Sequence, residues 1–330
     1  MPPLGLLVPS WLDLAGWAGV AVASVATMGL GRLVTRRRAP PESALIAGWG
    51  VIVLVLSGWG IATPASMYWP ALALLVLGIA GWADEISLFD GVHGTVAGTA
   101  ALAIGDLADR GGKKALRGVG RVVVLALPLL ALTASARPSL PDTWLNLLPN
   151  AAYLYDHNFF PADARPPAHS LLPGAPYNMQ LASYMAGLFL PNFPASAMID
   201  FNIVLQLAAG LLLARIILGE DTALPRWSIV ALGLLLAIPL NPGFDPRYHL
   251  SPYSEPSVMV VLAFAGWHAA RALDRIAGGR DARSDLIVLA LALAALVNIK
   301  QESVALAVGV VVALLWLAAM ARARQRATVV

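Results

Sequence analysis

The chain has no cysteine, so disulfides, thiol catalysis, Cys-ligated zinc and iron–sulfur clusters are excluded. Charge is also scarce. Only 12% of the residues are Asp, Glu, Lys or Arg, whereas an ordinary soluble domain has about 25%. Water cannot solvate a compact body with so few charges, so a soluble globular domain is excluded. Intrinsic disorder is excluded as well, because it requires low hydrophobicity, and here 58% of the residues are hydrophobic.

The apolar residues gather in runs that are long enough to cross a membrane. A spanning helix needs about 20 mostly apolar residues, because the hydrocarbon layer is about 30 Å thick. In lipid every backbone amide must be satisfied internally, so we predict an all-α polytopic bundle of about 9–10 transmembrane helices. The predicted spans are Leu14–Leu33, Ala44–Ile61, Met67–Ala83, Val122–Ala136, Ala195–Leu218, Trp227–Leu240, Pro256–Ala270, Leu286–Ile299 and Ser303–Ala321.

Two further apolar segments are short. Val92–Ile104 is rich in Gly and Thr and is interpreted as an interfacial helix. Tyr177–Leu190 carries Asn178 and Gln180, and it is interpreted as a re-entrant segment, an interfacial helix or a tenth span.

Charge predicts the orientation. The net charge is +3, and positive residues accumulate in short cytoplasmic loops. In a nine-span arrangement all of the 22 Lys and Arg residues fall on one side except Arg137, Arg165, Arg247 and Lys300. We therefore expect a protein of the plasma (bacterial inner) membrane with its C-terminus in the cytoplasm. The basic residues then set topology and meet anionic lipid headgroups, so no nucleic-acid partner is expected.

The unusual polar residues lie on the opposite, outer face. The loop Arg137–Pro176 has about 40 residues, far more than most connections, and long loops are often functional. Its stretch Thr143–Tyr155 has helical character, with Asp142 as the expected N-cap and an apolar face that suits a helix on the membrane surface. We divide the chain here into an N-terminal four-helix membrane region, 1–136, with a cytoplasmic basic loop, and a second region, 137–330.

Two other outer segments add ionisable groups. Asn241–Glu255 is the second outer loop, and the turn Asn298–Ser303 carries Lys300. Ionisable groups at the edge of a membrane are costly, so by default they indicate function. The histidines show no metal-ligand spacing, and no metal ligand is predicted. The histidines of the outer loops are His157, His169 and His249.

Several outer motifs resemble one known family. Residues 142–161, residues 173–184 and, less specifically, 251–266 and 297–303 resemble outer segments of bacterial GT-C-fold membrane glycosyltransferases. That superfamily includes protein mannosyltransferases and aminoarabinose transferases. The motifs are DTWLNLLPNAAYLYDHNFFP, PGAPYNMQLASY, SPYSEPSVMVVLAFAG and VNIKQES. The chain departs from the family pattern where Thr143 replaces the second acid of an acidic pair.

The resemblance implies that region 137–330 is GT-C-like. It implies an inverting transfer of a sugar from a polyprenyl-phosphate donor to a cell-envelope acceptor at the extracytoplasmic face. The partners would be membrane lipid, the lipid-linked sugar and other envelope-assembly membrane proteins. No cofactor is assigned, and a divalent metal ion stays an open alternative. Asp142 is the candidate general base, with helix capping as its structural alternative.

Other residues receive roles from the same resemblance. Glu255 would orient the acceptor or bind a metal; alternatively it is a first-turn acid favoured by the helix dipole. Lys300, Arg247 and Arg137 would hold the donor phosphate, or they only extend toward the headgroups. Acceptor or donor binding is assigned to Asn150, Tyr153, Tyr177, Tyr253 and Gln301.

Two further functions stay open. The broken acidic pair at Thr143 favours a non-catalytic GT-C-like scaffold subunit of an envelope assembly. A lipid or solute transporter would need polar residues near mid-membrane in several spans. The predicted spans at both ends of the chain are almost wholly apolar, which argues against transport.

Overall fold

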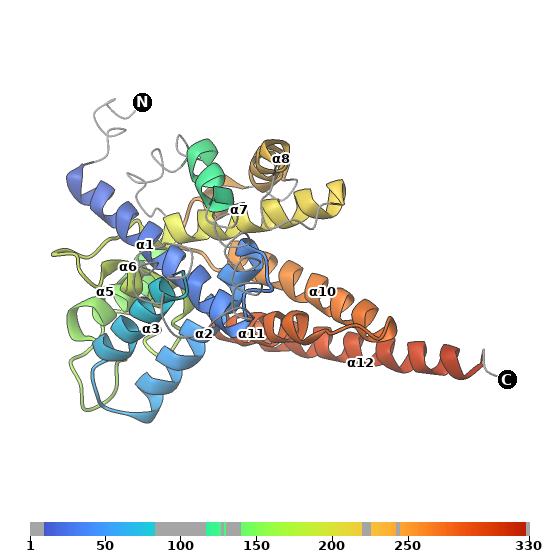
Figure 1. The fold of residues 1–330 in the computed structure, drawn as a ribbon. Coiled ribbons are helices and arrows are strands. Elements are labelled where there is room, and N and C mark those ends of the chain that lie inside the picture. The colour runs from blue at the N-terminus through green and yellow to red at the C-terminus, as the bar shows by residue number, and fades with distance from the viewer. Residues whose placement is uncertain are drawn as a thin grey trace, which may run out of the picture.

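The computed structural model describes residues 10–82, 117–126, 129, 140–219, 226–241 and 245–327, and it forms helices and no strands within them. Val92–Ile104, Arg137 and most of Val122–Ala136 lie outside the described residues. The elements are α1 (Trp11–Val34), α2 (Pro41–Ala62), α3 (Tyr68–Ala80), the π-helix η2 (Thr143–Leu147), α5 (Leu148–His157), α6 (Asn178–Gly187), α7 (Ala197–Leu218), α8 (Trp227–Ala237), α9 (Pro246–His249), α10 (Glu255–Ala277), α11 (Arg283–Ile299) and α12 (Ser303–Ala327) (Figure 1).

Five of these helices are long and apolar enough to cross a membrane, namely α1, α2, α7, α10 and α12. Each overlaps a predicted span, so the all-α class and the spanning length of these five are confirmed. Three other predicted spans are shorter helices: α3 has 13 residues, α8 has 11 and α11 has 17. The total number of spans therefore stays a prediction.

Local sequence signals explain several helix ends. Ser10 and Asp13 form a capping box at the start of α1, in which the Ser10 hydroxyl accepts from the Asp13 amide and the Asp13 carboxylate accepts from the Ser10 amide. Pro41 opens α2, where its missing N–H costs nothing. Gly219 ends α7 with φ of 62°, a left-handed conformation that glycine adopts without strain.

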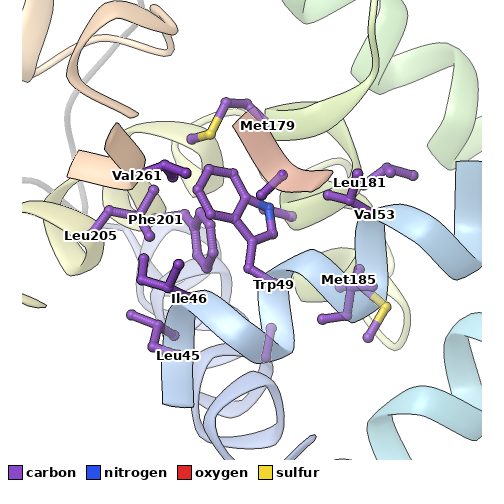
Figure 2. Close-up of a cluster of buried hydrophobic side chains, with 14 of the residues drawn as sticks. Leu45, Ile46, Trp49, Val53, Met179, Leu181, Met185, Phe201, Leu205 and Val261 are labelled. Carbon is purple, nitrogen blue, oxygen red and sulfur yellow. The ribbon is translucent and has the colours of Figure 1, made fainter. Parts of the chain in front are cut away.

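The hydrophobic core centres on Trp49 of α2. Its ring meets the ring of Phe201 on α7 edge-on, with centroids 5.3 Å apart, and Figure 2 shows side chains of α6, such as Met185, and of α10, such as Val261, around the pair. The same cluster thus contains residues from both sides of the predicted boundary at 136/137. The helices before and after that boundary share one core.

Helix α6 is buried along its whole length, with all ten of its residues inside the bundle. Ten residues extend only about 15 Å, which is too short to cross a membrane. The Asn178 amide donates to the Ala295 carbonyl of α11 at 3.0 Å, and the Tyr184 hydroxyl donates to Asn158 Oδ1 at 2.6 Å. Its burial rules out an interfacial helix, the re-entrant segment and the tenth span stay predictions, and Asn178 and Tyr184 serve packing inside the bundle.

The bundle has two chemically different ends. Helix α10 has Glu255 in its first turn and Arg275 in its last, about 30 Å apart along its axis at 1.5 Å per residue. We call the end that holds Asp142, Tyr253 and Glu255 the aspartate end, and the end that holds Arg275 and Arg215 the arginine end. In Figure 1, α10 and α12 run side by side toward the arginine end and the C-terminus.

Helices α1 and α2 approach each other through glycines. A Cβ built on Gly48 would overlap the carbonyl oxygen of Thr27, and one on Gly31 would overlap the carbonyl oxygen of Ala44. The two backbones therefore touch directly, as small residues allow in membrane bundles. This contact sets the spacing at the start of α2.

We predict that Gly48→Ala lowers the midpoint of thermal unfolding in detergent, because its methyl group forces α1 away from α2. Such overpacking typically costs about 1–3 kcal/mol. Gly58→Ala on the same helix is the control, because nothing lies within 4 Å of its Cβ position. Equal midpoints for the two variants would contradict direct backbone contact.

Candidate functional site

Asp142 lies at the start of the helical segment but does not cap it. Its backbone is helical, with φ of −62° and ψ of −27°, and its side chain makes no capping hydrogen bond. The N-cap prediction is therefore wrong, because a capping residue needs an extended backbone to turn its side chain onto the first amides. Instead, Asp142 Oδ2 accepts a hydrogen bond from the Tyr253 hydroxyl at 3.1 Å.

The helix that follows Asp142 is partly covered by protein. Helix α5 buries Leu148, Ala151 and Leu154 and packs against α6, whereas Trp144 of η2 is 57% exposed. The predicted helix is confirmed, but most of its apolar face turns to the bundle. Only the exposed η2 residues present apolar surface outward.

A proline just after η2 leaves a helical carbonyl free to bind the returning loop. Pro149 in α5 has no N–H, so it leaves the Leu145 carbonyl without its usual helical partner. The Leu171 amide fills this position at 3.0 Å. The returning part of the loop is thereby joined to the helix that begins after Asp142.

Tyr253 is held in place by Asn202 of α7. The buried Asn202 amide donates to the carbonyls of Ser251 and Tyr253 at 2.8 and 2.9 Å, and the Ser257 hydroxyl donates to Asn202 Oδ1 at 2.6 Å. The ring of Tyr248 meets that of Tyr253 with centroids 5.7 Å apart. These contacts fix the turn before α10, and so they fix the hydroxyl that reaches Asp142.

A second pair lies beside the first. Lys300, directly after α11, donates to Glu255 Oε1 at 2.5 Å, and the two side chains are 38% and 45% exposed. Glu255 is two residues from Tyr253 and its charge acts on the Tyr253 phenol, so the two pairs lie near each other at the aspartate end. We call Asp142, Tyr253, Glu255 and Lys300 the acid–tyrosine cluster.

The acid–tyrosine cluster keeps its phenol protonated. Burial raises the pKa of Tyr253, and the hydrogen bond to Asp142 and the negative charges of Asp142 and Glu255 raise it further. The folded-state pKa is thus above the ordinary value. The stabilisation from this bond is therefore present through neutral pH and is lost only as pH rises through the raised pKa.

Three predicted binding residues hold the outer loop instead of facing the cluster. Each donates a hydrogen bond from its side chain to a backbone carbonyl of the return path. The bonds run from Asn150 Nδ2 to Leu172 at 3.1 Å, from Tyr153 Oη to Pro166 at 2.9 Å and from Tyr177 Oη to Pro173 at 3.0 Å. Their polar groups are thereby occupied in positioning the segment that follows Asp142.

Of the remaining predicted residues, two are exposed and one is not described. Arg247 is 76% exposed and pairs with Asp245 of its own loop at 2.7 Å. Gln301 is exposed in the turn before α12, and Arg137 lies outside the described residues. Within the described ranges, no three His, Asp or Glu side chains are arranged to hold a metal ion.

An apolar cleft runs beside α7, between α1 and the helical stretch 117–126. It has a volume of about 140 Å³, and its lining extends from Asp200 to Arg215. These two residues are about 22 Å apart along the helix at 1.5 Å per residue. The Asp200 end lies two residues from Asn202, which holds Tyr253. We call this feature the α7 cleft.

The sequence interpretation missed a buried polar network at the arginine end. His268 Nε2 contacts the Ser43 hydroxyl at 2.9 Å and its Nδ1 contacts Asp285 at 2.8 Å. This is the connectivity of a Ser–His–Asp triad, but the three residues are only 1–3% exposed and out of reach of a substrate. Their role is to tie α2, α10 and α11 together.

A buried ion pair accompanies this network. Glu42 of α2 and Arg215 of α7 are 2.6 Å apart and almost fully buried. For the contacts at Asp285, the sequence signal was the spacing of His268, Arg271 and Arg275 on one face of α10, since residues three and four apart share a helix face. The sequence interpretation gave Arg271 and Arg275 only a topological role.

We predict that Glu42→Gln destabilises the protein by about 3–5 kcal/mol, because it leaves a buried guanidinium without its carboxylate. The measurement is the midpoint of thermal unfolding in one detergent. Asp281→Asn is the matched control, because its pair with Arg38 at the same end is about half exposed. A midpoint for Glu42→Gln equal to that of the control would refute the structural role of the pair.

No family model, no curated protein and no solved structure matches this chain. The resemblance to GT-C glycosyltransferases thus gains no support from these comparisons. What is shown is that the described part of the chain is all-helical and includes five helices of membrane-spanning length. A function for it must be inferred from its own residues and their geometry.

Proposed function

We propose that the chain is an integral membrane glycosyltransferase that moves a sugar from a polyprenyl-phosphate donor to an acceptor at its aspartate end. One observation carries the proposal: the acid–tyrosine cluster, in which Asp142 contacts Tyr253 while Glu255 contacts Lys300. An acid, a phenol and a cation–acid pair at the edge of an apolar bundle are the groups that such a transfer needs. These groups could serve several transfer reactions, and the assignment to sugar transfer rests on the motif resemblance.

The chemistry follows from the charges that develop. The acceptor hydroxyl attacks the anomeric carbon, its proton passes to the Asp142 carboxylate, and the bond from that carbon to the phosphate oxygen breaks. The phosphate leaves with the bonding electron pair and gains negative charge, which the Lys300 ammonium stabilises. A single displacement of this kind inverts the anomeric centre.

Tyr253 and Glu255 position these two groups. The phenol donates to one carboxylate oxygen of Asp142 and leaves the other available to the acceptor. Glu255 restrains the Lys300 side chain, which is otherwise long and flexible. Asn202 of α7 binds the backbone of the turn that carries Tyr253 and leads to Glu255. Helix α7 therefore supports both residues.

The α7 cleft supports a lipid-linked donor. It is almost entirely apolar and begins near Asp200, within one helical turn of Asn202. A polyprenyl tail can lie in such a cleft while its phosphate remains at the water edge. The aspartate end would face the extracytoplasmic side, because Arg215, Arg271, Arg275 and Arg280 gather at the opposite end.

We predict that Asp142→Asn lowers transfer by about 10²–10⁴-fold, the usual contribution of a general base, while protein amount and thermal stability stay unchanged. The measurement is transfer of radiolabel from a polyprenyl-phosphate sugar in membranes that contain the chain. Asp156→Asn is the control, an exposed acid of the same loop. Full transfer by Asp142→Asn would defeat the assignment.

Tyr253→Phe separates an enzyme from a scaffold. In an enzyme, loss of the hydrogen bond to Asp142 lowers kcat by about tenfold, since a bond to a charged group contributes about 1.5–3 kcal/mol. A scaffold instead tolerates Asp142→Asn, Tyr253→Phe and Glu255→Gln alike, and loses function when residues 140–176 are deleted. Complementation of a deletion strain by the three point variants distinguishes these outcomes.

A further inference from the structure

An open cavity lies at the aspartate end, where the end of α2 meets the outer loop. Its volume is about 370 Å³, and residues 60–64 and 160–162 line it together with Arg165. The Asn298 amide, two residues before Lys300 of the acid–tyrosine cluster, donates to the Ser57 hydroxyl of α2 at 3.0 Å. Ser57 is one helical turn before the cavity, which we call the α2 pocket.

The two walls of the α2 pocket are anchored to each other. A Cβ built on Gly60 would lie 2.5 Å from a ring carbon of Phe160, so this ring rests directly on the backbone of α2. The ring of Tyr177 meets that of Phe160 with centroids 4.7 Å apart. Just before the pocket wall, the Asn158 carbonyl accepts from the Met67 amide at 2.7 Å. The shape of the pocket is therefore preformed.

Arg165 brings a positive charge to the pocket. Its Nη1 donates to the Phe160 carbonyl at 2.7 Å, and its Cζ lies 4.5 Å from the centroid of the Phe159 ring. Neither partner carries a net charge, so the two contacts hold the guanidinium without neutralising it. A guanidinium has five N–H donors, and the Phe160 carbonyl takes one of them. The described residues that line the pocket include no acid.

The end of α2 brings the opposite polarity. The Thr63 amide and hydroxyl both donate to the Trp59 carbonyl, at 2.9 and 3.1 Å. The next residue, Pro64, has no N–H. The helix therefore supplies no donor for the carbonyls of residues 60–62, which carry the negative end of its dipole. These carbonyls suit an ammonium group.

An apolar stripe of α2 leads away from the pocket. Leu54 and Ile61 are 52% and 82% exposed, and the exposed Gly58 lies between them on the same helix face. Helix α2 is long and apolar enough to cross a membrane, so in a membrane this stripe faces acyl chains and its end at Ile61 lies near the headgroups. A ligand that matches the whole site has a phosphate, a nearby ammonium and a hydrocarbon chain.

We propose that the α2 pocket binds a phospholipid with an ethanolamine headgroup. The phosphate lies against the Arg165 guanidinium, the ammonium donates to the last carbonyls of α2, and one acyl chain follows Leu54 and Ile61. Paired guanidinium N–H groups match phosphate oxygens. A choline headgroup has no N–H for the carbonyls, and a glycerol headgroup has no positive charge. The inference does not rest on the proposed sugar transfer.

The first test uses the full chain in dodecyl maltoside micelles. The midpoint of thermal unfolding is measured with dioleoylphosphatidylethanolamine, with its choline and glycerol counterparts, and with O-phosphoethanolamine alone. A lipid that binds only the folded state raises the midpoint in a saturable way. We expect the ethanolamine lipid to act at about tenfold lower concentration than the other two lipids, because its ammonium adds charge-assisted hydrogen bonds.

Two outcomes of this test would overturn the proposal. Equal effects of the three lipids would show that the headgroup is not recognised. A full rise with O-phosphoethanolamine alone would show that the pocket takes a soluble zwitterion and that the apolar stripe of α2 contributes nothing.

The second test places the site on the chain. We expect Arg165→Gln to weaken the apparent affinity for the ethanolamine lipid about tenfold, since it removes a charge-assisted contact with the phosphate. Arg247→Gln is the matched control, because it removes an exposed arginine of another outer loop, outside the pocket. Equal affinities of these two variants would refute the location.

A further pair of variants keeps Arg165 in place, in case Arg165→Gln does not fold. Ala162 is exposed, lines the pocket and accepts from the Arg165 amide at 2.9 Å. Ala162→Glu therefore adds a carboxylate that competes with the lipid phosphate, whereas Ala162→Gln adds nearly the same volume without charge. We expect the glutamate variant alone to bind the ethanolamine lipid more weakly. Equal affinities of the pair would contradict a phosphate at Arg165.

Discussion

The structure depends on one constraint: a polar side chain inside an apolar bundle must find its partner within the protein. Water is not present to compete for or replace these contacts, so each one fixes the relative position of two helices. Asn202 holds the turn at Tyr253, and Glu42 holds Arg215 across α2 and α7. The apolar contacts around Trp49 are numerous but interchangeable, whereas these polar contacts specify one register.

Much of the helical architecture could be predicted from hydropathy alone. The long apolar runs gave α1, α2, α7, α10 and α12, because length and apolar content are properties of each run by itself. The division at 136/137 rested on loop length, and loop length does not report on packing. Trp49 and Phe201 are 152 positions apart and share one core. Such pairing depends on tertiary contacts that no single segment encodes.

The candidate site was predicted in part. Asp142, Glu255 and Lys300 stood out because they are ionisable groups at the ends of apolar runs. The contact of Tyr253 with Asp142 could not be predicted, since it needs the geometry of two loops at once. The cap expected at Asp142 failed because its backbone is already helical, which the local sequence signal does not report. The side chains of Asn150, Tyr153 and Tyr177 donate to backbone carbonyls of their own loop. A polar loop residue can thus hold the loop together instead of binding a ligand.

The bond between the Leu171 amide and the Leu145 carbonyl has a consequence for how such a loop can diversify. The carbonyl is available because Pro149 cannot bond to it, and so the loop is anchored at a point that the helix itself supplies. Residues 162–164 before this anchor are exposed. Insertions there would lengthen the loop without moving helix α5 before it or the Leu171–Leu145 hydrogen bond after it. The length of that stretch can therefore change while the carboxylate beside Tyr253 keeps its position.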